Sequence, residues 1–171
     1  SPARGSRGRI YPDLADYPKV VGGIDPASPA AAVAFYTAVL DGAAVLAVRD
    51  TETAELVKLL ETTYRDVNIA LASEFARYAA GRGLPVDEAI AAANTQPYSH
   101  IHRPGIGVRG HCIPVYPYCL YSDEAPGHLT LPRAAGQPSD AKVPWALGRL
   151  ASALGGLAGR RIAILGAGNT G

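Results

Sequence analysis

The chain has 171 residues, a formal net charge of +1 at pH 7, and apolar side chains at 48% of its positions. That length and apolar content predict one folded domain rather than a disordered chain, and the near-zero charge argues against a nucleic-acid partner. No apolar run approaches the roughly 18 residues of a membrane-spanning helix, and no charged-then-apolar leader opens the chain, so we expect no membrane partner. The two cysteines lack a framework spacing, which favours the cytoplasm.

The first 50 residues predict a short α/β arrangement. Residues 1–18 lack periodicity and predict a loop. Residues 19–23 and 43–48 are short apolar runs that predict strands. Between them, residues 28–40 predict a helix, with Ser28 as the N-cap that accepts hydrogen bonds from the first helical amides.

Residues 51–80 predict one long helix, because they contain neither proline nor glycine and their apolar residues recur at steps of three and four. Such a helix spans about 45 Å, which is long for a protein of this size. We therefore expect a homodimer in which this helix packs against its copy. The apolar stripe is Val57, Leu60, Tyr64, Val67, Leu71, Phe75 and Tyr78.

The rest of the chain alternates helices with long irregular segments. Residues 87–93 and 140–154 predict helices, and residues 160–165 predict a strand. Residues 94–118 and 122–138 are rich in proline and glycine and predict loops, which in compact domains are often functional when they are this long. The predicted fold is mainly α, with a long core helix and a few short strands.

A glycine-rich loop carries the strongest chemical signal. In residues 105–118 Cys112 follows His111 directly, close behind several glycines. Glycines let the backbone approach a ligand closely, and a thiol there can act as a nucleophile if its pKa is lowered. The other cysteine, Cys119, is expected to pack in the core. His100 and His102 give only a weak metal signal, so we predict no metal site.

The cysteine loop resembles the nucleophile loop of the nucleotide-sugar 6-dehydrogenases, whose usual wording is close to GVGGHCIPVDPY. Residues 54–71 resemble the start of the central helix of that family. Residues 18–25 resemble the exit from its NAD domain, and residues 159–166 the first strand of its C-terminal domain. The resemblance implies a family that oxidises the C6 alcohol of UDP-glucose, GDP-mannose or UDP-N-acetylmannosamine with NAD.

The resemblance also implies a division of the chain. Residues 1–24 would be the tail of an N-terminal Rossmann domain, residues 25–158 the central helical dimerisation domain, and residues 159–171 the first strand and glycine-rich stub of a C-terminal domain. The final glycines match G-x-G-x-x-G without the helix and acidic residue that a dinucleotide site needs. We therefore expect no cofactor site in this chain, and a chain without methionine is expected to be processed or part of a longer protein. Its high content of alanine, glycine and arginine favours a bacterial origin.

Catalytic roles carry over only in part. In the family a cysteine attacks the aldehyde, and a lysine and an asparagine steady the oxyanion; Cys112 and Lys58 match the first two. Thr62 stands where the asparagine is usual, Tyr116 where an aspartate is usual, and Ala3 where a glutamate is usual. Loss of both carboxylates removes the bases that would help water hydrolyse a thioester. We expect no four-electron oxidation by this chain alone.

Several loop residues remain candidates beside these. His111, Lys58 and Arg109 can lower the pKa of Cys112 if they converge on it, and Tyr116 can donate or accept a proton. Arg109 replaces a glycine of the family loop. The candidate substrate-binding residues are Arg109, Gly107, Gly110 and Arg103.

Three functions remain open, and with them the question of whether the chain is an enzyme. The first is a truncated, catalytically degenerate nucleotide-sugar dehydrogenase. The second is a repurposed non-redox enzyme that catalyses a cyclisation, isomerisation or addition on a small-molecule intermediate at Cys112 and Lys58. The third is a non-catalytic dimerisation module.

Overall fold

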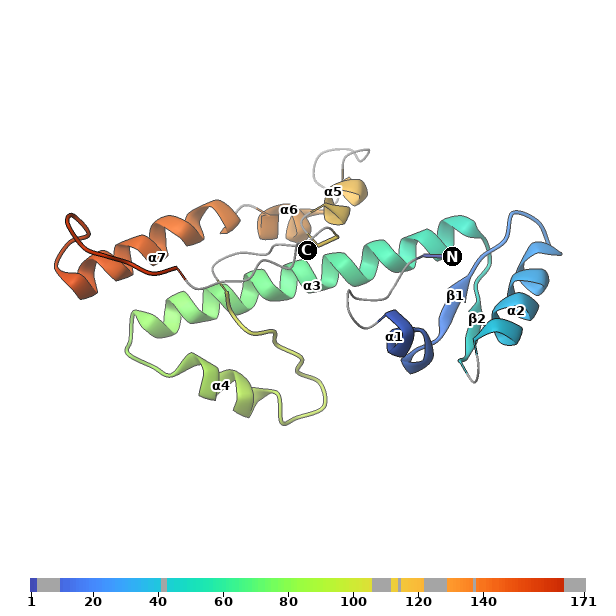
Figure 1. Ribbon diagram of the computed structural model, residues 1–171, viewed down its shortest axis with the longest axis horizontal. Coiled ribbons are helices and arrows are strands. Elements are labelled where there is room, and N and C mark those ends of the chain that lie inside the picture. The colour runs from blue at the N-terminus through green and yellow to red at the C-terminus, as the bar shows by residue number, and fades with distance from the viewer. Residues whose placement is uncertain are drawn as a thin grey trace. The chain divides into compact units, whose positions relative to one another are not determined.

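The structure is a computed structural model that describes residues 1–2, 10–40, 43–105, 112–113, 115–121, 129–136 and 138–164. Helices dominate it, and its described strands form one two-stranded sheet (Figure 1). The mainly α prediction is confirmed. The chain divides into two compact units, residues 1–61 and 62–171. None of the helices in the described part is long and apolar enough to cross a membrane.

The first unit is built on two parallel strands. It contains α1 (Ile10–Asp16), β1 (Lys19–Val21), α2 (Ser28–Val39) and β2 (Val45–Ala47). The strands pair with Lys19 opposite Val45, and α2 is the crossover that a parallel pair requires. Val20 and Val21 are almost fully buried, so β1 carries the core of this unit.

Two expectations for this unit are wrong. Residues 1–18 are not all loop, because α1 occupies Ile10–Asp16; a seven-residue helix is too short to show a helical period in the sequence. Ser28 is not the residue that caps α2. Instead Asp25 Oδ1 accepts hydrogen bonds from the amides of Ala27 and Ser28, at 2.9 and 2.7 Å, and from the Ser28 hydroxyl at 2.8 Å.

The backbone after β1 packs without room for a side chain. A Cβ on Gly22 would overlap the carbonyl group of Asp50, and one on Gly23 would overlap the ring of Pro29. Asp50 caps the long helix α3, accepting a hydrogen bond from the Thr53 amide at 2.8 Å. Hydrogen bonds from Thr53, with the guanidinium of Arg49, lower the pKa of Asp50 to about 2.

The second unit is organised along α3, which runs over Thr51–Ala80 as predicted and crosses the boundary between the units. Gly83 ends it with a positive φ of 67°, and the Leu84 amide returns to the Ala79 carbonyl at 3.0 Å. The helix α4 (Val86–Ala93) follows, with Pro85 rather than a hydrogen-bonding side chain at its N-cap. The later helices are α5 (Tyr116–Tyr121), α6 (Thr130–Gly136) and α7 (Pro138–Leu154).

The remaining corrections fall in the C-terminal half. The predicted loops contain α5 and α6, which have six and seven residues and are too short for a periodic signal. Residues 160–164 form no strand, because the described part of the chain offers them no neighbouring strand to pair with. Cys119 on α5 is exposed rather than in the core.

Replacing Gly22 tests the tight packing after β1. We expect Gly22→Ala to lower the free energy of unfolding by about 1–3 kcal/mol, because backbone must move to admit the methyl group. Gly148→Ala in α7 is the matched control. Its Cβ would meet nothing within 4 Å, so we expect it to raise stability by about 0.5–1 kcal/mol through helix propensity. Urea denaturation measures both, and equal effects would contradict the packing argument.

Candidate functional site

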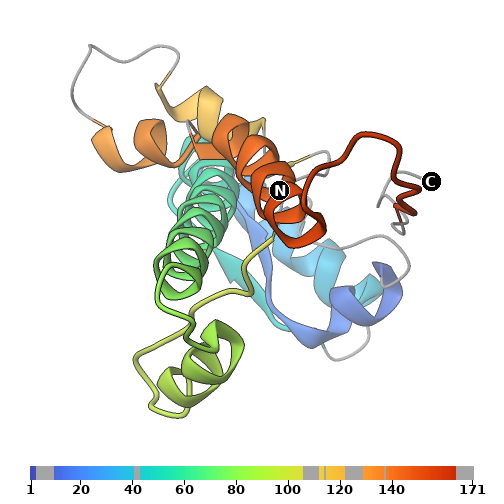
Figure 2. The same ribbon diagram turned by 90° about the vertical axis from the view of Figure 1, so that its left-hand side faces the viewer.

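The segment that leads to the cysteine loop is held by two asparagine side chains. Residues 94–105, here called the strap, leave the end of α4 and return to α3 (Figures 1 and 2). Asn94 Nδ2 donates to the Ile101 carbonyl at 2.8 Å, and Asn94 Oδ1 accepts from the Ile101 amide at 2.9 Å. Asn68 on α3 donates to the His100 carbonyl at 2.7 Å and accepts from the His102 amide at 2.9 Å.

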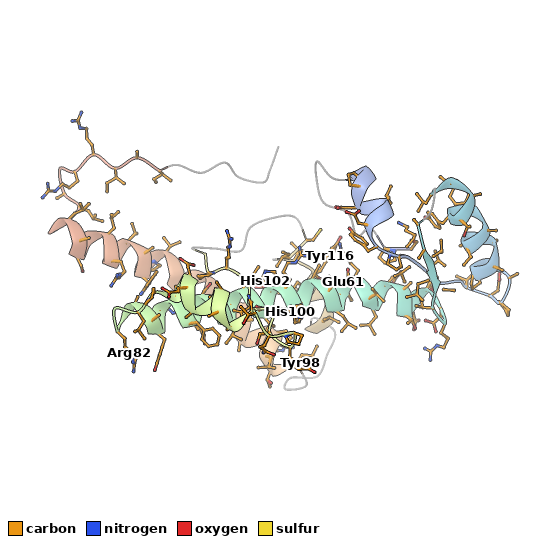
Figure 3. All side chains as sticks on the ribbon, turned by 90° about the horizontal axis from the view of Figure 1, so that it is seen from below. Glu61, Arg82, Tyr98, His100, His102 and Tyr116 are labelled. Atoms are coloured by element: carbon orange, nitrogen blue, oxygen red, sulfur yellow. The ribbon has the colours of Figure 1, made fainter. Side chains whose placement is uncertain are left out.

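The first part of the strap is a compact turn. Thr95 Oγ1 donates to the Ala92 carbonyl at 2.8 Å, and the Tyr98 amide donates to Gln96 Oε1 at 3.0 Å. Gln96 Nε2 also donates to Ser99 Oγ. Figure 3 labels Tyr98 on this segment together with His100 and His102. The turn therefore presents Tyr98, whose side chain is 90% exposed, from a backbone fixed by its own polar side chains.

A cavity of about 640 Å³ lies between α4 and the strap. That volume is within the range of small-molecule sites. Ile90, which is buried, forms part of its apolar wall, and Arg103 adds an exposed cation. The lining residues are Asp87, Ile90, Ala91, Asn94, Ile101, His102 and Arg103. The cavity can hold a small polar organic ligand, and of the predicted substrate-binding residues it contains Arg103.

His102 is the titratable group most affected by this environment. Burial, together with the positive charge of Arg65 on α3, lowers the pKa of His102 below its ordinary value of 6.5. Its imidazole is therefore neutral at pH 7 and can donate one hydrogen bond and accept another. Because the folded state favours the neutral form, this contribution to stability is complete above pH 6.5 and is lost as the pH falls through the lowered pKa.

Cys112 lies at the entrance to α5 and is half-buried. Its carbonyl accepts hydrogen bonds from the amides of Val115 and Tyr116, at 3.2 and 2.9 Å. The backbone therefore brings together two of the predicted catalytic residues, Cys112 and Tyr116. Figure 3 labels Tyr116, whose side chain is half-buried.

The other predicted residues are placed unevenly. Thr62 is buried on α3 and makes interactions there, and Lys58 precedes it by one helical turn in the first unit. The positions outside the described residues are Ala3, Gly107, Arg109, Gly110 and His111. Sequence reasoning missed Asn68 and Asn94 as site-building residues, because neither spacing nor composition distinguishes them from ordinary polar residues on a helix.

The β1–α2–β2 unit does not fit a dinucleotide. A pyrophosphate needs free amides at the N-terminus of the helix and a glycine that leaves room for it. Here the carboxylate of Asp25 already accepts from the amides at the start of α2, and the Asp50 carbonyl occupies the space beside Gly22. A second negative charge there would be repelled, so the β1–α2–β2 unit does not suit a pyrophosphate.

Comparison with known proteins gives a consistent set of matches. Residues 52–134 match the family model described as the central domain of the UDP-glucose/GDP-mannose dehydrogenase family. The UDP-N-acetyl-D-mannosamine dehydrogenase of Pyrococcus horikoshii is 42% identical over 154 residues, which cover 90% of this chain and 36% of that protein. The one from Methanocaldococcus jannaschii is 45% identical over 119 residues, 70% of this chain and 27% of that protein.

Solved structures agree with these sequence matches. The P. horikoshii UDP-D-ManNAc dehydrogenase has a TM-score of 0.81 at 42% identity and covers 90% of this chain and 36% of that one. A UDP-N-acetyl-mannosamine dehydrogenase from Staphylococcus aureus has a TM-score of 0.74 at 31% identity, covering 92% and 37%. The chain therefore spans about a third of the length of the curated relatives it matches.

The charge of Arg65 can be tested through His102. We expect Arg65→Gln to raise the pKa of His102, because it removes a cation that disfavours the imidazolium. NMR titration of the imidazole C–H protons measures this, with His100→Gln used to assign the signals. Arg82→Gln is the control, because Arg82 stacks on the Tyr78 ring at 3.8 Å beyond the end of α3. Equal pKa changes in the two variants would contradict the assignment.

Proposed function

Because the chain belongs to the nucleotide-sugar dehydrogenase family, of which it carries the central domain, we propose that it is a catalytically degenerate member whose cysteine loop still engages a nucleotide sugar. The relatives are named UDP-N-acetyl-D-mannosamine dehydrogenases, so we propose a UDP-N-acetylhexosamine as the ligand. The observation that carries the degeneracy is the presence of hydroxyl side chains at Thr62 and Tyr116, where the family resemblance implies an asparagine and an aspartate.

Cys112 supports nucleophilic addition, the first step, but the described side chains do not support hydrolysis, the last step. The Cys112 thiolate can add to a carbonyl carbon, which gives a tetrahedral oxyanion. A later hydrolysis at that carbon needs a base to activate water. Tyr116, one turn after Cys112, and Thr62, buried on α3, are both hydroxyl groups rather than carboxylates or amides. Their weak basicity is why we propose that this chain alone does not complete a four-electron oxidation.

The NAD-dependent part of the family chemistry is proposed to lie outside the residues described. We propose that residues 1–24 continue a dinucleotide-binding domain, that residues 25–158 form the central domain, and that residues 159–171 open a C-terminal domain. The capped start of α2 supports a dinucleotide site elsewhere, because it leaves the β1–α2–β2 unit without a place for a pyrophosphate. We propose a bacterial protein of the cytoplasm, the compartment where nucleotide sugars are made.

A homodimer through α3 is the second component of the proposal. In the second unit one face of α3 buries small side chains, among them Ala70 and Ser73. The predicted apolar stripe lies on the open side, with Tyr64 56%, Leu71 44%, Phe75 40% and Tyr78 60% exposed. Large apolar side chains in a continuous row on a surface are typical of an interface. A second copy supplies a matching row, because a twofold interface uses the same patch twice.

A charge in the stripe tests the dimer. We expect Phe75→Glu to convert the dimer to a monomer, because a carboxylate would lose its water without gaining a partner. Light scattering and sedimentation measure the mass. Leu131→Glu on α6 is the matched control, since Leu131 is 70% exposed and lies off the stripe. A wild-type chain that is monomeric at all concentrations would contradict the dimer proposal.

Calorimetric titration tests the ligand. We expect the chain to bind UDP-N-acetyl-D-mannosamine and not NAD, with affinity reduced severalfold in Arg103→Gln because a charge-assisted contact is lost. Glu88→Gln, also exposed and on α4 away from the cavity lining, is the control. Binding of neither ligand would defeat the proposal.

A second candidate function is favoured by the neutral imidazole at the cavity. A neutral His102 beside Arg103 suits a proton transfer on an anionic small molecule, as in a cyclisation, isomerisation or addition. It would need no NAD. If Cys112→Ala and Lys58→Ala change stability only, the third function, a dimerisation module, is favoured over both.

A further inference from the structure

We propose that Asn68 and Asn94 are positioning residues that together form a clamp on residues 100–102, and so set the path by which the chain reaches Cys112. The inference rests on the proposed role of Cys112 as the reacting group. The two asparagines hold the backbone of residues 100–102, away from the thiol, and need no contact with a ligand.

The hydrogen-bond pattern of the clamp is that of a central β-strand. The carbonyl of His100 and the amide of His102 both bond Asn68. The carbonyl and amide of Ile101, the residue between them, both bond Asn94. Alternate residues of a strand address opposite neighbours. Residues 100–102 therefore lie between two side-chain amides that take the places of two neighbouring strands.

Each amide uses both its donor and its acceptor, so each attachment has two points. Two bonds from one planar group fix orientation as well as position. The distances, 2.7 to 2.9 Å, are those of well-formed hydrogen bonds. Tyr64 Oη lies 3.0 Å from Asn68 Nδ2 and further restricts the rotamer of Asn68.

The two asparagines belong to different helices, and this gives the clamp its effect. Asn68 lies on α3, and Asn94 is the C-cap residue of α4. The strap cannot slide along one helix without breaking bonds to the other. Further along, Ser73 Oγ, which is buried on α3, approaches the Gly105 carbonyl at 3.4 Å. On the far side of the loop the Cys112 carbonyl is tied to the start of α5.

Placement matters here because reactivity at a nucleophile depends on geometry of about an ångström. Gly105 is the last described residue before the loop, and Cys112 follows it by seven positions. The clamp fixes residues 100–102 before this segment, and α5 holds the Cys112 carbonyl after it. Fixing both ends of a segment limits the conformations open to it. The clamp therefore acts on Cys112 without touching it.

Asparagine-to-aspartate substitutions test the clamp with almost no change of shape. In Asn68→Asp the carboxylate still accepts from the His102 amide, but it faces the His100 carbonyl with no hydrogen to donate. Asn94→Asp does the same at the Ile101 carbonyl. Gln96→Glu is the matched control, because it makes the same chemical change within the turn, where Gln96 bonds only Tyr98 and Ser99 among the described residues. All variants carry Cys119→Ser, so that iodoacetamide reports on Cys112 alone.

Two measurements are made on each variant. Hydrogen exchange of the Ile101 and His102 amides reports whether the strap opens. The rate of Cys112 alkylation, followed from about pH 6 to about pH 10, reports on the thiol itself. For both asparagine variants we expect exchange about tenfold faster, the effect of losing one hydrogen bond of ordinary strength. We also expect a severalfold change in alkylation rate with a displaced pH profile, and neither effect in Gln96→Glu.

The outcomes separate the clamp from the proposed function. Unchanged exchange in both variants, or faster exchange with an unchanged alkylation profile, would overturn the inference. A role in stability alone would shift the urea midpoint and leave that profile where it was. If Asn68→Asp does not fold, Asn94→Asp on the exposed side of the strap decides the matter. Alkylation needs no sugar or dinucleotide, so absent UDP-sugar binding would defeat the proposed function and leave the clamp standing.

Discussion

The unbroken ladder of main-chain hydrogen bonds along α3 is the constraint to which the other described features attach. Thirty residues without proline or glycine let one helix run from the cap at Asp50 to the turn at Gly83. In the first unit its start packs against the backbone of Gly22. In the second unit it carries Asn68, which holds the strap at His100 and His102. A break in this ladder would displace Asn68 and so remove the attachment of the strap to α3.

Family membership and the proposed loss of chemistry rest on different observations. Family membership rests on the match over residues 52–134 and on the similarity to solved dehydrogenase structures. Chemistry depends on a few side chains, and at Thr62 and Tyr116 hydroxyl groups stand where the family pattern has an amide and a carboxylate. A hydroxyl can hydrogen-bond an oxyanion or water, but it is a far weaker base than a carboxylate. The fold survives such exchanges because it depends on helix packing rather than on those groups.

The sequence was most informative where a pattern is long. The bounds of α3 follow from thirty residues of periodic apolar positions, and the strands and α2 follow from short but well-separated runs. α1 and α6 were missed because seven residues make only two turns. Residues 160–165 read as a strand, but a strand exists only with a partner. The clamp could not be foreseen, because the bonds of Asn68 join residues more than 30 positions apart.

The strap is held through its peptide groups, and this leaves its side chains free to diverge. Within the strap, Asn68 and Asn94 bond only carbonyl oxygens and amide hydrogens of residues 100–102. Any residue except proline at 101 or 102 offers the same groups. The histidines at 100 and 102 are therefore open to replacement over evolutionary time with no change in the course of the chain. The main chain of the strap keeps its course while single substitutions change the charge and polarity of the neighbouring cavity.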